Sequence, residues 1–345
     1  MHDGDWLTET GGRIRGVLKS MVDAGRLPGG TAVVGTGGMW EFVAVGGVDG
    51  EHGTAPDVLY DVASLTKVMA TWPLVGQAVA DGLVDLDAPV SEYLPADGLP
   101  GEAVTVRRIL THTSGLNPVT WLERYVGTDQ DLAEAILADP LEEPGRHHYI
   151  DRGFILLGLV LERLYGSGLD VLAAELWDEF GMRSTVFGPL TRSLAVAPTE
   201  VRLPGTAPTW GVVHDEAAAL MGGVAGHAGV FTTAIDLGAF AREVLREGES
   251  GGGVLPAPYV RESWRPHADA GEGLWRGLGW LVTPEGVVHH NGFTGTSLFL
   301  HPESGRYVGV LTNAVHYGRE RTGLRELRAQ VRAALTPQPH HGSQP

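Results

Sequence analysis

The strand-forming segments of this chain lie at its two ends, and this distribution restricts the fold more than any other feature. Near the N-terminus, two short valine-rich runs flank a Gly-Gly pair, which predicts a β-hairpin over residues 30–46. From about residue 250 onward, similar runs return, divided by Gly and Pro: GLGWLVTP, GVVHHN, TSLFLHP and RYVGVLTNA. Helical patterns separate the two groups, so strand and helix do not alternate as in βαβ units. We therefore expect one mainly antiparallel sheet assembled from both ends of the chain.

Residues with helical periodicity fill most of the remaining sequence. Apolar residues repeat at helical spacing over residues 8–24, and Leu324, Leu327 and Val331 share one face of a last helix. Four further helices are expected in the middle of the chain: Ser64–Ala80, Asp131–Ala138, Gly153–Leu164 and Leu169–Phe180. The predicted fold class is α/β (α+β): an antiparallel β-sheet flanked by the N- and C-terminal helices, with a mainly helical inserted lobe.

A single unit is expected over residues 8–335. Its α/β lobe would comprise about residues 8–75 and 265–335, and its helical lobe about residues 76–264. The tail TPQPHHGSQP, residues 336–345, is predicted to be disordered, and EGESGGGVLPAP is predicted to be a surface loop. Because ligands usually bind in clefts between lobes, the site is expected where the two lobes meet.

The charge balance argues against two classes of partner. The chain has 42 acidic and 25 basic residues, and the net charge of −17 disfavours nucleic acid and anionic membrane surfaces. The same charge slightly favours neutral or cationic ligands. There is no cysteine, which excludes disulfides, a thiol nucleophile and a zinc–thiolate site.

The sequence does not predict insertion into a membrane. It contains no stretch of about 18 consecutive apolar residues, the length that a membrane-spanning helix needs. The N-terminus begins acidic and has no apolar run of signal-peptide length. We therefore expect a cytoplasmic protein.

Lys67 stands three residues after Ser64 in the segment DVASLTKVMA. It and Lys19 are the only lysines among 25 basic residues, and lysine, unlike arginine, loses its proton when it is desolvated or placed beside another cation. On a helix, residues three apart share a face with Cβ atoms roughly 5–6 Å apart. A lysine with a lowered pKa would then activate the serine hydroxyl as a nucleophile. Two simpler interpretations stay open: a genome that prefers arginine codons, and Ser64 as a helix N-cap.

Further motifs follow Ser-x-x-Lys along the chain. They are LVDLDAPVSEYLP, then ILTHTSGL at 109–116, EPGRHHYID at 143–151, GGVAGHAGVFTT at 222–233 and HHNGFTGTSLFLHPESG at 289–305. With these motifs in this order, roughly residues 10–335 resemble the serine β-lactamase and penicillin-recognising D,D-peptidase superfamily, on the side of the class C β-lactamases and related esterases. The resemblance implies a serine hydrolase or acyltransferase that uses no cofactor and no metal.

A first group of site residues surrounds Ser64. The resemblance implies that Ser64 is the acylated nucleophile, Lys67 its partner base and Tyr149 a proton shuttle. Asp151 stands where the family usually has asparagine. Its carboxylate cannot donate a hydrogen bond to a substrate carbonyl, and it favours the charged form of Lys67, which shifts the role of base toward Tyr149. As a negative charge near the scissile bond, Asp151 would also favour neutral or cationic substrates.

A second group lies on the predicted strand beside the cleft. His290, Asn291 and Gly292 match the family's Lys/His-x-Gly element, and the resemblance implies an oxyanion hole formed by the backbone N–H groups of Ser64 and Phe293. The family's lysine in this element supports binding of a substrate carboxylate. A neutral histidine at position 290 would weaken that binding, so both departures argue against an efficient β-lactamase.

Three histidine-containing groups suggest a metal site instead, although none has the i, i+4 helical spacing of a strong zinc motif. They are His147 and His148 with Asp151, His289 with His290, and His214 with Asp215. Metal catalysis is therefore the weaker interpretation.

Three functions remain. The first is a serine hydrolase that acts through a Ser64 acyl-enzyme on a small ester, amide or D-amino-acid-type substrate. The second is a transacylase of small-molecule metabolism that passes the acyl group to an amine or alcohol. The third, a non-catalytic ligand-binding relative, is disfavoured because Ser64, Lys67 and Tyr149 are all present. The expected partners are a small-molecule acyl donor and, for a transacylase, an amine or alcohol acceptor.

Overall fold

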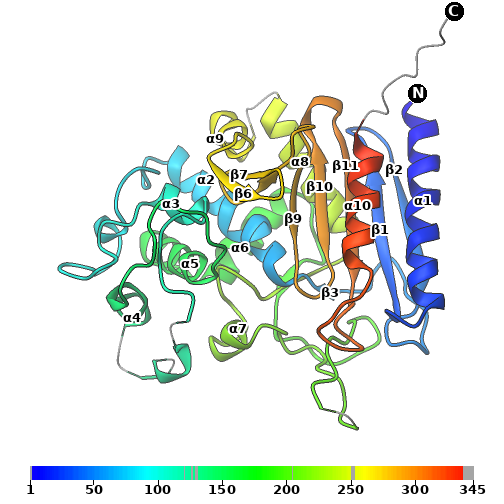
Figure 1. The fold of residues 1–345 in the computed structure, drawn as a ribbon, viewed down its shortest axis with the longest axis horizontal. Helices are drawn as coiled ribbons and strands as arrows, with labels where there is room; N and C mark the ends of the chain where they lie inside the picture. Colours follow the sequence, from blue (N-terminus) through cyan, green and yellow to red (C-terminus); the bar gives the residue numbers. More distant parts are fainter. Residues whose placement is uncertain are drawn as a thin grey trace, which may run out of the picture.

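The computed structural model describes residues 2–119, 121–125, 127–128, 131–203, 205–249 and 253–336. Its centre is an eight-stranded sheet in the order β2-β1-β11-β10-β9-β8-β7-β6, in which neighbouring strands are antiparallel (Figure 1). The strands are β1 (Gly29–Gly35), β2 (Trp40–Gly46), β6 (Ala268–Gly271), β7 (Leu274–Arg276), β8 (Leu281–Val282), β9 (Val288–Asn291), β10 (Ser297–His301) and β11 (Arg306–Thr312). Strand β1 pairs directly with β11. The prediction that both ends of the chain build one antiparallel sheet is confirmed.

Helices cover both faces of this sheet. Helices α1 and α10 pack on one face and α8 packs on the other, while α2 to α6 form a mainly helical part beside the sheet (Figure 1). The helices are α1 (Asp3–Asp23), α2 (Trp72–Ala80), α3 (Val106–Leu110), α4 (Leu132–Ala138), α5 (Arg152–Tyr165), α6 (Leu169–Glu179), α7 (Glu216–Leu220), α8 (Ala234–Glu249), α9 (Ala257–Ser263) and α10 (Leu324–Leu335). The predicted fold class is confirmed.

The alternation of side chains along the central strands explains the two layers. Val33 of β1 belongs to the core that α8 closes, whereas its neighbours Ala32 and Val34 belong to the core beneath α1 and α10. In β10, Phe299 faces the same way as Ala32, and Leu298 faces the opposite way. Successive strand residues point to opposite faces, so a sheet that is covered on both sides needs apolar residues at nearly every position.

The start of helix α1 and the extent of the strand in GLGWLVTP differ from the predictions. Helix α1 begins at Asp3 instead of residue 8, because Trp6 and Leu7 are buried and the Trp6 indole donates to Ala334 O of α10 at 2.9 Å. In GLGWLVTP only Leu281–Val282 is strand, since Gly279 adopts a φ of 82° and breaks the extended backbone. The hairpin and the helix from Leu324 are confirmed.

The predicted continuous helix over Ser64–Ala80 is wrong. The chain instead forms a short 3₁₀ turn at Ala63–Leu65, a π-helical turn at Lys67–Thr71 and an α-helix only from Trp72. Pro73 lies in the first turn of α2, and the Met69 carbonyl four residues before it accepts a hydrogen bond from the Trp177 indole at 2.8 Å in place of a backbone N–H. Proline therefore sets where the regular helix begins, and the irregular turns before it carry Ser64 and Lys67.

A small second sheet anchors the segment that leads into Ser64. Strand β3 (Tyr60–Asp61) pairs with β5 (Val230–Thr232), which also pairs with β4 (Val186–Phe187). The chain enters the Ser64 turn directly from β3, so the sheet fixes the position of that turn.

Residues 337–345 of the predicted tail and residues 250–252 of the predicted surface loop lie outside the described residues. Within the described ranges, no helix combines the length and apolar character needed to cross a membrane. The cytoplasmic placement stays a prediction.

Candidate active site

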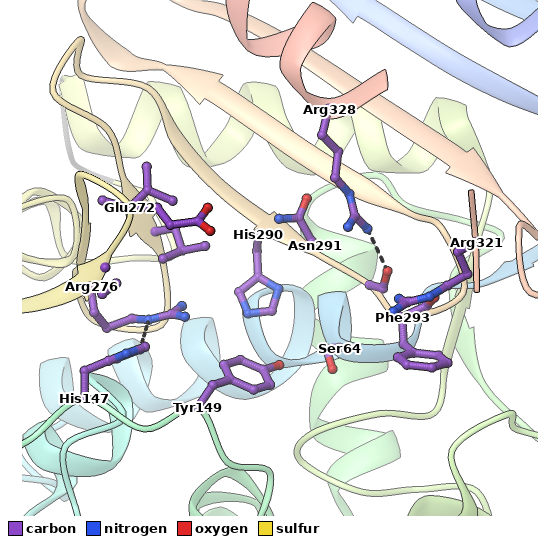
Figure 2. A pocket seen from close by; sticks show the side chains of 15 residues that line it. Ser64, His147, Tyr149, Glu272, Arg276, His290, Asn291, Phe293, Arg321 and Arg328 are labelled. Carbon is purple, nitrogen blue, oxygen red and sulfur yellow. Dashed lines mark hydrogen bonds between the residues drawn. The ribbon is translucent and has the colours of Figure 1, made fainter. Parts of the chain in front are cut away.

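A cavity of about 350 Å³ brings together the candidate residues that are far apart in the sequence (Figure 2). The side chains and backbone that line it include Ser64, His147, Tyr149, Glu272, Arg276, His290, Asn291, Gly292, Phe293, Arg321 and Arg328. Lys67 and Asp151 are not among the lining residues, but both lie next to Ser64 through the contacts described below. The candidate set from the sequence is thus assembled at one place.

Ser64 is held on a tight turn that strains the backbone. Ala63 has a φ of 48°, in the left-handed region that non-glycine residues rarely adopt. The buried Asp61 carboxylate accepts hydrogen bonds from the backbone N–H groups of Ala63 and His214, each at 2.8 Å. Such conformations persist only where the surroundings enforce them, and they cluster at functional sites. The turn leaves Ser64 half-buried at the cavity wall.

Lys67 is fully buried and uses all three hydrogens of an ammonium group. Its Nζ donates to Ser64 Oγ at 3.0 Å, to Asp151 Oδ1 at 2.7 Å and to the His227 carbonyl at 3.3 Å. A charged ammonium can donate to all three, whereas a neutral amine would need the Ser64 hydroxyl to donate to its lone pair instead. The geometry therefore fits a charged Lys67 in the resting protein.

The electrostatics agree with that state. Burial alone would lower the pKa of Lys67, but the charge of Asp151 and the contribution of Tyr149 outweigh burial and hold this pKa above its ordinary value. Burial likewise would raise the pKa of Asp151, and Lys67 brings it below its usual range. The general expectation of a lysine with a lowered pKa is wrong here, and the direction of the shift agrees with the prediction that Asp151 favours the charged form of Lys67.

Tyr149 covers the Lys67 amine from the cavity side. Lys67 Nζ lies 5.0 Å from the centroid of the tyrosine ring, and the His112 ring packs against that ring with a centroid separation of 4.5 Å. The side chain is 38% exposed, and Figure 2 shows its hydroxyl pointing toward Ser64. A proton leaving Ser64 therefore has both Lys67 and Tyr149 nearby.

His290 lies in β9 at the cavity, and it is neutral. Burial, followed by the cations Arg276 and Lys67, holds the pKa of His290 well below its usual value. Its neighbour Asn291 approaches His289 Nδ1 through its side-chain nitrogen at 3.4 Å, and the Asn291 Oδ1 has no hydrogen-bond partner among the described residues. The neutral histidine that the sequence analysis expected is thus supported by the electrostatics.

The turn after β9 is fastened to the segment that precedes Ser64. The Thr294 hydroxyl donates to Asp61 O at 2.7 Å and the Thr296 hydroxyl donates to Val62 O at 2.9 Å. In the part of the chain that the structure describes, neither the Ser64 nor the Phe293 backbone N–H donates to a protein acceptor. These threonines therefore hold the Phe293 backbone beside the Ser64 turn. The backbone N–H groups of Ser64 and Phe293 remain available as hydrogen-bond donors.

Replacing Gly292 by alanine should disturb this turn without changing any polar side chain. A Cβ at position 292 would overlap the Thr296 hydroxyl and the Val62 carbonyl oxygen, so that the backbone that carries the Phe293 N–H must shift. Loss of one oxyanion donor typically costs about 10²–10³-fold in rate. We expect Gly292→Ala to lower the acylation rate by such a factor while the circular dichroism spectrum stays native. Gly37→Ala, at a hairpin position where an added Cβ meets nothing within 4 Å, is the control, and equal rates in the two variants would contradict the role of this turn.

Arg276 is a site residue that the sequence analysis missed. It follows Leu274 and Trp275 at the end of β7, is only 3% exposed and lines the cavity. Its Nε lies 3.4 Å from His147 Nε2, while its Nη1 has no hydrogen-bond partner, and the guanidinium forms no ion pair within the described residues. Burial lowers the pKa of Arg276 to about 10, so the side chain remains charged at neutral pH. The only sequence signal was a lone arginine in an apolar run, which does not predict a site.

A pair formed by the buried His227 and the half-buried Asp215 was also missed. His227 Nε2 lies 2.8 Å from Asp215 Oδ1, and the carbonyl of His227 is the third acceptor of Lys67. The sequence analysis used GGVAGHAGVFTT only as one of the motifs that carry the resemblance. The structure adds that this segment supplies a carbonyl to Lys67 and that its histidine is oriented by a carboxylate.

The histidine groups that suggested a metal have other contacts. His214 Nε2 lies 3.0 Å from Glu200 Oε2, and the His289 ring stacks on Phe299 with a centroid separation of 4.9 Å. Among the described residues, no three His, Asp or Glu side chains come together as metal ligands would.

Three comparisons with known proteins agree with this geometry. A model of the family described as Beta-lactamase matches residues 14–333. A Salmonella typhimurium (strain LT2) protein named "Putative D-alanyl-D-alanine carboxypeptidase" is 28% identical over 306 residues, which cover 75% of this chain and 70% of that protein.

Two solved structures have the same fold. The structure described as SurE is 25% identical, with a TM-score of 0.75, and the match covers 95% of this chain and 76% of SurE. A class C beta lactamase from Rhodobacter sphaeroides is 20% identical with a TM-score of 0.76, and the match covers 94% of this chain and 98% of that one.

Proposed function

The chain belongs to the beta-lactamase family and is a serine hydrolase, and from this we propose that it acts through a Ser64 acyl-enzyme on a small ester or amide of the D-amino-acid type that carries a free carboxylate. The roles of the individual residues and the nature of the substrate are both part of this proposal. The observation that carries the substrate class is the buried, unpaired guanidinium of Arg276 in the cavity.

The proposed reaction begins with attack of Ser64 Oγ on the substrate carbonyl. The hydroxyl proton moves to the Tyr149 oxygen, which is a phenolate for this step, because the Lys67 ammonium has no lone pair with which to accept it. Lys67 touches Ser64 Oγ and lies against the Tyr149 ring, so its charge stabilises that phenolate. The same pair then gives a proton to the departing alcohol or amine. Asp151 keeps Lys67 charged and in place.

The negative charge of the tetrahedral intermediate needs fixed donors. The backbone N–H groups of Ser64 and Phe293 would supply two hydrogen bonds to its oxygen, and such donors act without reorganising during the reaction. Water that attacks the acyl-enzyme completes hydrolysis and returns Ser64 to its free form.

Arg276 argues for an anionic substrate group, against the expectation of neutral or cationic substrates drawn from the sequence. The Asp151 carboxylate binds Lys67 and is not among the residues that line the cavity, so its charge is already compensated. Arg276 instead presents a charge there that contacts His147 Nε2 and the Tyr149 ring, 5.6 Å from its centroid, but forms no ion pair among the described residues. A buried charge of this kind is costly unless a ligand supplies a counter-charge. A guanidinium matches a carboxylate in a two-point hydrogen-bonded geometry. The relative named as a putative D-alanyl-D-alanine carboxypeptidase supports such a carboxylate-bearing substrate.

Arg276→Gln should reduce selectivity for carboxylate-bearing donors. The matched donors are an N-acyl-D-alanyl ester of D-lactate and the corresponding ester of D-lactamide, which differ only in a carboxylate and a carboxamide. A hydrogen bond to a charged group contributes about 1.5–3 kcal/mol, so we expect the ratio of kcat/KM for the two donors to fall about 10–100-fold in the variant. Arg163→Gln, at an exposed position on α5, is the control. An unchanged ratio in folded Arg276→Gln would remove the support for this substrate class.

Product analysis decides between water and another acceptor. The donor is incubated with the protein alone and with a D-amino acid or a simple alcohol, and the products are identified by mass. Release of the free acid in all incubations supports a hydrolase. Predominant transfer to the amine or alcohol would make the protein a transacylase that uses the same acyl-enzyme.

A further inference from the structure

A second concave surface, which we call the arginine groove, continues from the cavity along helix α10. It has a volume of about 640 Å³ and shares Glu272, Leu274, Asn291, Arg321 and Arg328 with the cavity wall. Beyond these it is lined by His289, Phe299, Glu320, Leu324, Arg325, Ala329 and Arg332. The groove is therefore an extension of the site and would be reached by a substrate larger than the cavity.

The groove concentrates positive charge in a strongly acidic protein. Four arginines line it, against the two acidic residues Glu272 and Glu320, although the whole chain carries a net charge of −17. Three of these arginines lie on α10 at positions 325, 328 and 332, the spacing that places side chains on one face of a helix. Figure 2 shows Arg328 reaching from α10 and Arg321 lying near Phe293.

Most of this charge has no carboxylate partner. Arg325 pairs with Glu272 at 3.7 Å, and both side chains are largely exposed, which makes that pair weak. Arg321 donates to Phe293 O at 3.0 Å and to Arg319 O at 3.1 Å. Arg328 donates to Gly292 O and Ser297 Oγ, each at 3.0 Å, and to Thr296 O at 3.3 Å, so the hydrogen bonds of both side chains go to neutral groups that leave their charge uncompensated. Across the described ranges, Arg321, Arg328 and Arg332 form no ion pair. Burial and the adjacent Arg321 lower the pKa of Arg328 to about 10, which leaves it charged at neutral pH.

The wall of the groove also holds unused hydrogen-bonding groups. His289 is 5% exposed and its Nε2 has no hydrogen-bond partner in the part of the chain that the structure describes, and the same is true of Asn291 Oδ1. Burial, followed by Arg276, Arg332 and Arg328, lowers the pKa of His289 to about 3, so its ring is neutral. The groove thus combines fixed positive charge with a neutral wall.

We propose that the arginine groove is a subsite for a phosphate group carried by the substrate, a proposal that rests on the proposed acyl-transfer function of the adjoining cavity. A single carboxylate is satisfied by one bidentate guanidinium. Three arginines that have no carboxylate partner among the described residues line one groove, which exceeds that need. A phosphate monoester carries about −1.5 to −2 charges and three acceptor oxygens, which matches several arginines at once.

The binding test uses inorganic pyrophosphate as the probe and isothermal titration calorimetry as the measurement. Arg325 and Arg332 line the groove but not the cavity, so the Arg325→Gln/Arg332→Gln protein tests the groove separately. We expect the dissociation constant to rise about tenfold or more in this variant, because hydrogen bonds to charged groups are lost. The exposed pair Arg163→Gln/Arg183→Gln is the control and should bind as the wild type does. Equal affinities in all three proteins would overturn the proposal.

The substrate role is tested with matched donors that carry either a phosphate monoester or a hydroxyl, placed in one pair on the acyl side and in another on the leaving group. In at least one pair we expect the phosphate to raise kcat/KM about tenfold, and the groove variant to remove that preference. No preference in either pair would overturn the proposal, even where the hydroxyl donors are hydrolysed normally through Ser64. Failure of all donors to acylate Ser64 would instead contradict the proposed function, so the two failures are distinguishable.

Discussion

Ser64→Ala should abolish hydrolysis of every ester donor, with kcat falling by about 10⁴–10⁶-fold, as removal of a nucleophile does in serine hydrolases. The reason is that Ser64 Oγ lies at the cavity wall, next to a charged Lys67. Without this hydroxyl, no nucleophilic oxygen stands where the surrounding groups can assist its attack on the substrate. The rate is measured with an activated ester at substrate saturation. Because alanine lacks only the hydroxyl, the strained turn at Ala63 should persist and the melting temperature should change little.

Ser193→Ala is the matched control for this substitution. Ser193 is exposed and is not among the residues that line the cavity, so that its loss should leave kcat at the wild-type value. If Ser64→Ala retained more than a few per cent of the wild-type rate, the acyl-enzyme at Ser64 would be the wrong intermediate.

Lys67→Arg should be nearly as damaging as Lys67→Ala, with a loss of about 10²–10⁴-fold in the acylation rate, the range typical of a lost acid–base group. The Lys67 ammonium is fully buried within 3.3 Å of three acceptors, which leaves no space for a guanidinium. Arginine would keep a positive charge but would not place an ammonium hydrogen on Ser64 Oγ beside Tyr149. Acylation is measured under single-turnover conditions, so that later steps do not hide the effect.

The other lysine provides the control. Lys19 is exposed on α1 and pairs with Asp23 at 2.7 Å, a contact that arginine reproduces. Lys19→Arg should therefore leave the acylation rate unchanged. Similar rates for Lys67→Arg and the wild type would favour the simpler interpretation, in which Lys67 is only a lysine that survived codon bias.

The residues that could be predicted from the sequence are those whose spacing or motif carries the information. The N-terminal hairpin and the late strands could be predicted because β-branched runs and glycine turns identify strands locally. The residues around Ser64 could be grouped because their motifs occur in an order that resembles one superfamily. The proximity of Lys67 to Ser64 followed from a three-residue separation, although the local structure is a 3₁₀ turn and a π-helical turn and not the regular helix that was expected.

The features that could not be predicted depend on contacts between distant segments. The effect of Asp151 on the charge of Lys67 was predicted from the motif that contains it, but the contact of Lys67 with the His227 carbonyl, which the turn before β5 supplies, was not. The importance of Arg276 depends on its burial without a carboxylate, and nothing in the adjacent sequence reports which acidic residues lie nearby. Strands β6 and β7, which are short and contain polar residues, gave no periodic signal.

The groove along α10 illustrates the same limit. Arg325, Arg328 and Arg332 look in sequence like the solvated face of an amphipathic helix. Only the packing of α10 over the end of the sheet turns that face toward the cavity, where it adjoins Asn291. The role proposed for the arginines of α10 therefore depends on the residues that face them across the groove, which the sequence does not report.

Covalent trapping tests the central claim most directly. The protein is incubated with a fluorophosphonate, the intact mass is recorded, and the modified peptide is sequenced by tandem mass spectrometry. We expect a single phosphonyl adduct on Ser64, complete loss of esterase activity in proportion to labelling, and no adduct on Ser64→Ala. An adduct on another residue, or one that persists in Ser64→Ala, would contradict the assignment of Ser64 as the nucleophile.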